Sequence, residues 1–280
     1  MEEHTSIPWK KYGKILGGVI LGWSFWFCLL VLVLRWVNPP FTAFTLQEEW
    51  GELGTERYSL RTNWVPGNEI PDHLKLAVVA SEDQRFYEHW GLDLAAIDQA
   101  IEENQQGRRI RGASTITQQV AKNLVLSSTQ SYLRKGVEAG IAVLIEIFWT
   151  KDRILEVYLN IAEFGPGIYG IGEASDFWFE KEVHEITPKE SARLATVLPN
   201  PKLIKADPAS EYVQERSFWI LRNMQQLSGI QYIPQPEPDT TDTLLQLDVI
   251  SDSVSTVRLL DLDSLQLHLD SMLMEMELEH

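Results

Sequence analysis

Directly after a strongly apolar run at Leu74–Ala80, the chain reads EDQRFYEHWG over residues 82–91. Apolar residues in this run recur at helical spacing, and Asp72 is the predicted N-cap. The stretch therefore predicts a buried helix that ends in two carboxylates, Glu82 and Asp83. Burial and a neighbouring like charge raise a carboxylate pKa toward values that suit a general acid or base. A helix end that simply becomes polar explains the same residues.

Negative charge is distributed unevenly along the chain. The 280 residues carry a formal net charge of -16, which disfavours nucleic acid as the main partner. Much of this charge lies in residues 234–280, where Arg258 is the only basic residue, and we interpret this segment as an acidic appended tail. The single cysteine, Cys28, excludes an internal disulfide and any cysteine-based zinc site.

An apolar stretch near the N-terminus predicts a membrane anchor. Ile15–Val37 contains no Asp, Glu or Lys, and it is long enough to span the ~30 Å hydrocarbon layer. Lys10, Lys11 and Lys14 precede it, so the positive-inside rule places residues 1–14 in the cytoplasm and the rest of the chain outside. A cleavable signal peptide and a buried core helix are the alternatives.

The remaining organisation is mainly α-helical. Prolines after Asn38 end the anchor helix, and a linker over residues 38–70 leads into a globular domain over residues 71–233. Long alternating strand patterns are missing from this domain. Further helices are predicted over Leu94–Gln105, Ser114–Leu126, Tyr132–Trp149, Thr150–Ala162 and Pro188–Leu198.

A second polar stretch reads GASTITQQVAKN over residues 112–123 and follows three arginines at positions 108, 109 and 111. Ser114 or Thr115 is a predicted helix cap, and the free N–H groups of such a helix start form a ready phosphate site. An ordinary amphipathic helix with a solvated face is the alternative. The candidate binding residues are Ser114, Thr115, Gln118, Gln119 and Lys122.

Two further stretches follow. In RKGVE, residues 134–138, Arg134 and Glu138 are four residues apart, which is typical of a surface ion pair. The functional interpretation makes Glu138 a second site carboxylate, while Arg134 and Lys135 neutralise a leaving diphosphate. The motif KDRILEVYLN, residues 151–160, predicts an amphipathic helix, and a purely structural role is enough to explain it. It leads to a tight glycine-rich loop predicted over Gly165–Gly170.

The order and spacing of these stretches resemble the peptidoglycan glycosyltransferase family, which polymerises lipid II. The matching motifs are EDxxFxxHxG, GxSTxTQQxxKN, RKxxE, KxxILExYLN, and ESARLA at 190–195 continuing into LPNP at 198–201. The resemblance covers roughly residues 38–225 and the anchor. Because no penicillin-binding transpeptidase domain follows, it points to the monofunctional biosynthetic form. Trp178 departs from the family, which more often has Tyr there.

The resemblance implies a mainly α fold: a lysozyme-like helical domain with a smaller membrane-associated lobe, preceded by one N-terminal transmembrane helix. Residues 124–126 and the apolar run Ile141–Trp149 could form the membrane-touching surface, although a place in the core also explains that run. It further implies a location in the bacterial inner membrane, with the catalytic domain on the periplasmic side.

For the chemistry, the resemblance implies that Glu82 is the base and that an inverting attack releases a polyprenyl diphosphate. Lys122, Arg134 and Lys135 would bind this leaving group, and Glu138 would complete the carboxylate pair. The other implied substrate-binding residues are Asp83, His89, Ser114, Thr115, Gln118 and Gln119. The sequence requires no cofactor and predicts no metal site, but leaves room for a divalent cation, Mg²⁺ or Mn²⁺, beside Glu138.

The implied partners are lipid II, the growing lipid-linked glycan strand, the membrane, and proteins of wall synthesis or division. Two alternatives stay open. A lytic enzyme of lysozyme-like fold would cleave glycan strands with the same pair of carboxylates and would not need Lys122 or Arg134. A membrane-anchored scaffold of the wall-building machinery would keep the fold without the activity.

Overall fold

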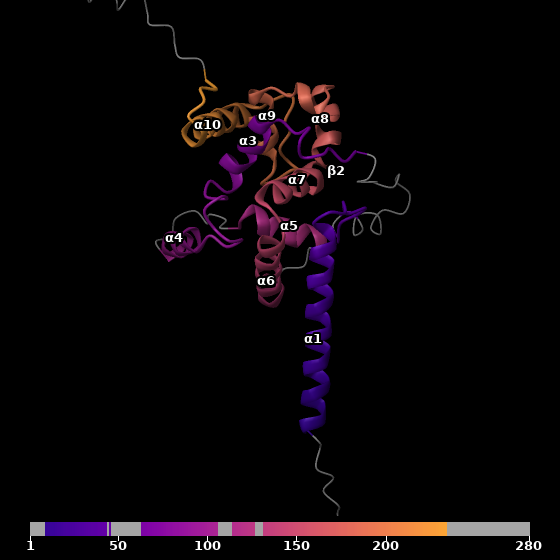
Figure 1. The fold of residues 1–280 in the computed structure, drawn as a ribbon. Helices are drawn as coiled ribbons and strands as arrows, with labels where there is room; N and C mark the ends of the chain where they lie inside the picture. Colours follow the sequence, from indigo (N-terminus) through magenta and orange to yellow (C-terminus); the bar gives the residue numbers. More distant parts are fainter. Residues whose placement is uncertain (1–8, 44, 46–62, 106–113, 127–130, 234–280) are drawn as a thin grey trace, which may run out of the picture. The chain divides into compact units, whose positions relative to one another are not determined.

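The computed structural model describes residues 9–43, 45, 63–105, 114–126 and 131–233. The tail at 234–280, most of the linker, and the arginines at 108, 109 and 111 lie outside the described residues. The described chain is mainly helical, as predicted, with one small two-stranded sheet (Figure 1). Its elements are α1 (Trp9–Leu34), α3 (Asp72–Glu82), α4 (Leu94–Gln105), α5 (Ile116–Val125), α6 (Tyr132–Phe148), α7 (Lys151–Ile161), β1 (Glu163–Gly165), β2 (Ile168–Tyr169), α8 (Ile171–Phe179), the short 3-10 helix η1 (Val183–Glu185), α9 (Pro188–Val197) and α10 (Glu211–Ser228).

Local capping signals explain where most helices begin. The hydroxyls of Thr115, Ser131, Thr150, Thr187 and Ser210 accept a backbone N–H in the first turn of α5, α6, α7, α9 and α10. The prediction that Asp72 caps α3 is wrong. Pro71 is the N-cap, and Asp72 is the first helical residue, where its charge favours the positive end of the helix dipole.

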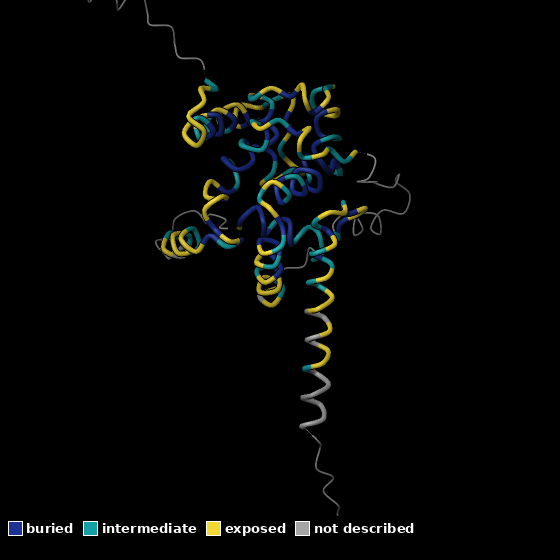
Figure 2. The backbone as a smooth tube through the Cα atoms, viewed as in Figure 1, coloured by how far each residue is buried: buried dark blue, intermediate teal, exposed yellow. Residues whose placement is uncertain are grey.

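The core joins two groups of helices. Helix α3 packs against α9 and α10, while α5 packs against α6 and α7. Side chains of all these helices form one hydrophobic cluster, and buried backbone follows their facing sides (Figure 2). The C-terminal end of α3 lies against the start of α5 in space, so the carboxylates of Glu82 and Asp83 lie where the two groups of helices meet.

Helix α1 contacts this body near its C-terminal end. The indole of Trp149 donates to the Val31 carbonyl at 2.7 Å, and Arg35 donates to the Phe148 carbonyl at 2.7 Å. Arg153 donates to the carbonyls of Leu34 and Val37 at 3.0 and 3.2 Å, which satisfies acceptors that the helix end leaves open. In the part of the chain that the structure describes, no helix qualifies by length and apolarity as a membrane span. The anchor over residues 15–37 stays a prediction.

The end of the predicted linker is part of the body. Val65 exchanges two backbone hydrogen bonds with the amide side chain of Asn160, at 2.7 and 2.9 Å, and the Trp64 indole donates to Glu156 at 3.0 Å. Ile70 is fully buried. Residues 63–70 therefore dock on α7, so the motif at 151–160 positions the chain that enters the domain.

Two glycines near the small sheet permit close backbone approach. Gly170 has φ 83°, and a Cβ there would lie 2.7 Å from the Asn160 carbonyl oxygen. Gly172 lies against the carbonyl of Asn63, where a Cβ would be 2.6 Å from the oxygen. The tight loop predicted at 165–170 is a β-hairpin turn, and these contacts hold its exit against α7 and the docked segment.

We expect Gly170→Ala to destabilise the domain more than Gly229→Ala. Both glycines have positive φ, so alanine costs roughly 1–3 kcal/mol of backbone strain at either position. Only at Gly170 does the added methyl group also clash with backbone, because nothing lies within 4 Å of the Cβ position at Gly229. Thermal unfolding followed by circular dichroism measures the difference, and equal losses for the two variants would contradict the predicted clash.

Candidate active site

Glu82 is the last residue of α3, and its carboxylate is half-buried. The amide of Gln119 donates to it at 2.9 Å, and the Ser81 hydroxyl lies 3.4 Å from its other oxygen. Burial raises the pKa of Glu82 above its ordinary value, and this effect exceeds the opposing effects of the two hydrogen bonds and of the Arg216 charge. The carboxylate is therefore a stronger base than an exposed glutamate.

A buried tyrosine fixes the amide that holds Glu82. The Tyr158 hydroxyl in α7 donates to Oε1 of Gln119 at 3.1 Å, so the Nε2 group of Gln119 faces Glu82. Burial, together with the charges of Glu82 and Asp83, raises the pKa of Tyr158 well above its ordinary value, and the hydroxyl stays a donor. Two hydrogen bonds therefore connect Tyr158 in α7 to Gln119 in α5, and Gln119 to Glu82 in α3.

Asp83 joins the end of α3 to the start of α5. Its buried carboxylate contacts Nε2 of His89 at 2.9 and 3.0 Å and accepts the backbone N–H of Ile116 at 3.1 Å. Ile116 is the first residue of α5, so the carboxylate satisfies an N–H that the helix leaves without an internal partner. These contacts indicate a structural role for Asp83 and His89. Direct substrate binding by them stays a prediction.

Thr115 and Gln118 form a capping box. The Thr115 hydroxyl accepts the N–H of Gln118 at 3.2 Å, and the Gln118 side chain accepts the N–H of Thr115 at 3.0 Å. The Thr115 hydroxyl also donates to the Gly91 carbonyl at 2.6 Å. With the Ile116 N–H bound to Asp83, these groups are not free to hold a phosphate. Side chains already satisfy the N–H groups of Ile116 and Gln118, which disfavours a bound phosphate there, and the phosphate site at this helix start stays a prediction.

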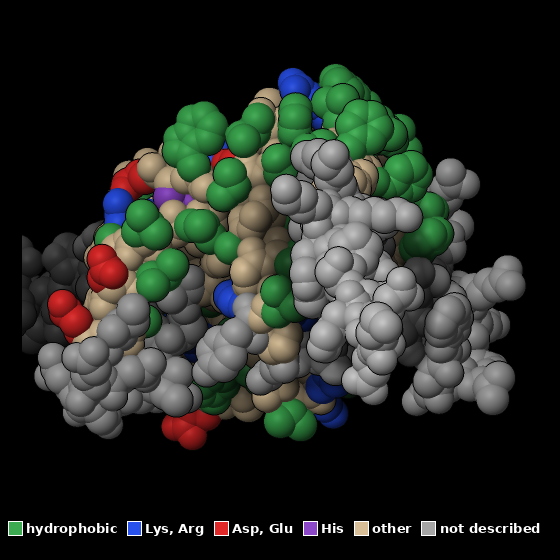
Figure 3. Space-filling view, turned by 90° about the horizontal axis from the view of Figure 1, so that it is seen from below, with side chains coloured by type: hydrophobic (Ala, Val, Ile, Leu, Met, Phe, Trp, Pro, Cys, Tyr) green, Lys and Arg blue, Asp and Glu red, His purple; other side chains and the backbone are tan. Residues whose placement is uncertain are grey.

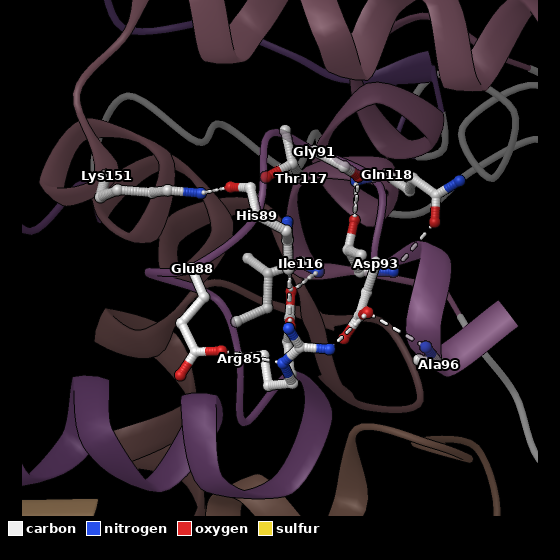
Figure 4. A network of polar contacts seen from close by, with 12 residues as sticks. Arg85, Glu88, His89, Gly91, Asp93, Ala96, Ile116, Thr117, Gln118 and Lys151 are labelled. Carbon is white, nitrogen blue, oxygen red and sulfur yellow. Dashed lines mark hydrogen bonds and ion pairs between the residues drawn. The ribbon is translucent and has the colours of Figure 1, made fainter. Parts of the chain in front are cut away.

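A second buried network surrounds this junction. Lys151 donates to the His89 carbonyl at 2.9 Å and to Glu146 at 2.8 Å, and the Thr117 hydroxyl donates to the same Glu146 oxygen at 2.6 Å. Nearby, Arg85 bridges Glu88 and Asp93, and Asp93 accepts the Ala96 N–H at the start of α4 (Figure 4). These contacts fix residues 83–93 around Glu82.

Glu138 lies beside three basic side chains, Arg134, Lys135 and Lys122, which we call the cationic cluster. The Glu138 carboxylate is almost fully buried, and it accepts from Lys135 and, at 3.4 Å, from Arg134. Lys135 also donates to the Ser114 hydroxyl at 3.1 Å, which ties α6 to the segment before α5. The Nε atom of Arg134 is buried, and it has no acceptor among the described residues. The cluster therefore retains an unused donor.

Lys122 couples the two carboxylates. It follows Gln119 by three residues on the same side of α5, and its charge interacts with those of Glu138 and Glu82. Burial is the largest effect and lowers the pKa of Lys122 below its ordinary value, with further lowering by Arg134 and Lys135. The structure thus places Lys122 within the electrostatic reach of both predicted catalytic glutamates.

The apolar run predicted to touch the membrane is divided between core and surface. Ile141, Ile145 and Trp149 are buried, whereas Val143 and Ile147 are exposed. Leu124, Val125 and Leu126 are half-buried against the same core.

Among the described residues, no group of three or more His, Cys, Asp and Glu side chains could hold a metal ion. Arg134 and Lys135 engage the two oxygens of Glu138, so this carboxylate does not fit the divalent cation considered from the sequence, and no step is assigned to one.

Comparison with known proteins identifies the family. Residues 49–225 match the family described as Transglycosylase. The chain belongs to the transglycosylase family. It is 48% identical to a biosynthetic peptidoglycan transglycosylase of Ectopseudomonas mendocina (strain ymp) over 75% of this chain and 87% of the relative. The proteins of that name from Pseudomonas entomophila (strain L48) and Stutzerimonas stutzeri (strain A1501) are 48% and 47% identical, with 74% and 75% of this chain and 88% of each relative covered.

Sequence reasoning missed two side chains of this transglycosylase site. Tyr158 was contained in a motif interpreted as structural, and no pattern within that helix indicates that its hydroxyl reaches Gln119. Arg216 lies on α10, a helix that was not predicted, yet its charge acts on Glu82. Its guanidinium also lies 4.0 Å from the centre of the Trp219 ring.

Asp83→Ala is expected to lower the free energy of unfolding by about 2–3 kcal/mol, since it leaves the Ile116 N–H and His89 without their charged acceptor. Asp72→Ala is the matched control, because the Asp72 side chain is fully exposed and solvent screens its 3.5 Å ion pair with Lys75. Denaturant unfolding measures both. Wild-type stability combined with lost activity in Asp83→Ala would instead assign Asp83 to the chemistry.

Proposed function

We propose that this protein polymerises lipid II into linear glycan strands, with Glu82 as the general base. The observation that carries the proposal is the pairing on α5 of two groups with opposite tasks. Gln119 holds the Glu82 carboxylate at 2.9 Å, and Lys122, one turn later, belongs to the cationic cluster around Glu138. Because α5 carries both Gln119, which holds Glu82, and Lys122, it fixes the base relative to the cationic side chains. This arrangement suits attack on the anomeric carbon and departure of an anion from the same carbon.

In the proposed step, Glu82 takes the proton from the sugar 4-hydroxyl of the acceptor. The hydroxyl oxygen forms a bond to the anomeric carbon of the donor, and the bond from that carbon to the diphosphate breaks. The leaving group departs with the electron pair, so attack from the opposite face converts an α-linked donor into a β-linked product. The raised pKa of Glu82 supports this role, because it makes the carboxylate a stronger base.

The leaving diphosphate develops negative charge and needs no proton. Lys122, Arg134 and Lys135 supply the opposing charge, and the unused Nε donor of Arg134 adds a hydrogen bond. Glu138 is contacted by both Arg134 and Lys135, so we assign it to orienting these cations. Ser114, which accepts from Lys135, has the same supporting role.

The lytic alternative uses the same two carboxylates as acid and nucleophile or base. In this chain, Glu138 is occupied by two cations, which makes it a poor nucleophile toward a sugar. A cluster of three basic side chains also has no task in hydrolysis of an uncharged glycosidic bond. The cationic cluster therefore favours synthesis over cleavage.

The proposed location is the bacterial inner membrane, with the catalytic domain on its outer side. The apolar sequence of residues 15–37 and the three lysines before it support this location. Seen from below in Figure 3, hydrophobic side chains are spread over much of the described surface. In α6, Leu133, Val137, Val143 and Ile147 are exposed. Such a surface suits contact with lipid, where the polyprenyl chain of the substrate resides.

Glu82→Gln is expected to lower the rate of glycan formation from labelled lipid II by about 10²–10⁴-fold, the usual contribution of a general base. The same variant is expected to unfold at a higher temperature. Because the folded-state pKa of Glu82 is raised, its ionised form destabilises the fold once pH exceeds the unfolded-state value, and glutamine removes this cost at neutral pH.

The exposed residue Glu69 provides the matched control, and Glu69→Gln should change neither the rate nor the unfolding temperature. Polymerisation by Glu82→Gln at the wild-type rate would exclude the proposed base. Cleavage of preformed glycan strands by the wild-type protein, without polymer from lipid II, would support the lytic alternative.

The pH dependence of kcat/KM is expected to be bell-shaped. Activity rises as Glu82 loses its proton, and it falls as Lys122 loses its proton below the ordinary lysine range. Lys122→Arg should move the descending limb to higher pH and leave the rising limb in place, because arginine stays charged. Exposed Lys189→Arg is the control and should keep both limbs. An unmoved descending limb in Lys122→Arg would remove Lys122 from the charge-dependent step.

A further inference from the structure

A cavity lies among residues that take no part in the Glu82 site. Its volume is about 760 Å³, within the range of ligand-binding clefts. The β1–β2 turn, the end of α8, one side of α9 and the segment at 205–208 form its walls, and we call it the aromatic cleft. Its lining residues are Pro166, Ile168, Phe177, Trp178, Phe179, Glu180, Glu190, Arg193, Lys205, Asp207 and Pro208.

Three consecutive aromatic side chains at the end of α8 give the cleft its apolar surface. Phe177 is 59% exposed, while Trp178 and Phe179 are half-buried. The Trp178 indole donates to the Phe164 carbonyl at 2.9 Å and lies close to Gly165, where a Cβ would be 3.0 Å from the ring. Phe177 meets Trp178 edge to face, with ring centroids 4.9 Å apart. The platform is therefore held before any ligand arrives.

The charged lining is largely paired. Glu190 accepts from Lys181 at 2.6 Å, and Arg193 donates to Asp207 at 3.1 Å. Glu180 and Lys205 have no ionic partner among the described residues. Glu180 also has φ 54°, at a helix end where glycine is the usual residue. One free carboxylate and one free ammonium group thus remain at the cleft.

These features select among ligand classes. Three carboxylates in the lining disfavour a polyanion, and five charged side chains disfavour a lipid chain. A sugar ring suits the aromatic platform, because its weakly positive C–H face is attracted to the negative face of an aromatic ring. Peptides attached to the sugar supply carboxylate and ammonium groups that complement Lys205 and Glu180.

We propose that the aromatic cleft binds the peptide-bearing glycan strand that the enzyme makes, and that it retains the strand between successive additions. The inference rests on the proposed function, because that function defines the strand as the product. Retention at a second site keeps the strand end at high local concentration near the enzyme, so fewer strands are lost before the next addition. Loss of the site should shorten the product.

The test uses the full-length chain with Glu82→Gln in every variant, so that the strand is bound and not extended. The probe is a set of uncross-linked glycan strands that carry their peptides, and calorimetry measures the dissociation constant. Phe177→Ala should weaken binding roughly ten-fold, the effect of losing one stacked ring, and Lys205→Gln should weaken binding only of strands that keep their peptides. Phe218→Ala, an aromatic residue 47% exposed outside the cleft, is the matched control and should bind as its parent does.

With Glu82 restored, Phe177→Ala should make shorter strands than Phe218→Ala from the same lipid II. Equal strand affinity in Phe177→Ala and Phe218→Ala would overturn the inference, and so would affinity for a proline-rich peptide in place of the strand. The experiment distinguishes failure of the proposed function from failure of this inference. If the wild-type protein makes no polymer, the proposed function fails; if it polymerises but strand binding does not depend on the cleft, only the inference fails.

Discussion

The buried carboxylate of Asp83 is the contact on which the geometry of the site depends. It binds His89 and the first N–H of α5, and so joins the end of α3 to the start of α5. Glu82 immediately precedes this contact, while Gln119 and Lys122 lie one and two turns beyond it. Because hydrogen bonds to a buried charge are strong and their loss leaves unsatisfied groups, the junction is rigid. The position of Glu82 relative to the cationic cluster follows from that rigidity.

Burial then adjusts the chemistry of both groups in opposite directions. It raises the pKa of Glu82 and lowers the pKa of Lys122, so both values move toward neutral pH. Structural ion pairs usually do the reverse, because each charge favours the ionised form of the other. Here desolvation exceeds the attraction, which costs stability and is typical of a site that performs acid, base or charge-stabilising chemistry.

The sequence predicts elements whose signals are local and misses contacts that join distant segments. The bounds of α4 agree with the prediction, and α5, α6, α7 and α9 differ from it by only one or two residues at an end, because hydroxyl caps such as Thr115 and Thr187 mark their starts. Neither α8 nor α10 was predicted. The missed contacts depend on how helices far apart in sequence come together. They are the hydrogen bonds between Val65 and Asn160, the hydrogen bond from Tyr158 to Gln119, and the effect of the Arg216 charge on Glu82. The hydrophobic periodicity of a single segment does not predict such contacts.

The two carboxylates alone do not decide between making and breaking a glycosidic bond, since either reaction needs an acid or a base beside an anomeric carbon. The difference lies in what receives the electron pair. A sugar leaving group needs a proton from a nearby acid, whereas a diphosphate needs only positive charge. Arg134 and Lys135 both contact Glu138, and Lys122 is close enough for its charge to act on Glu82 as well. In the proposed mechanism, a site arranged in this way stabilises the leaving anion, and Glu82 accepts the proton.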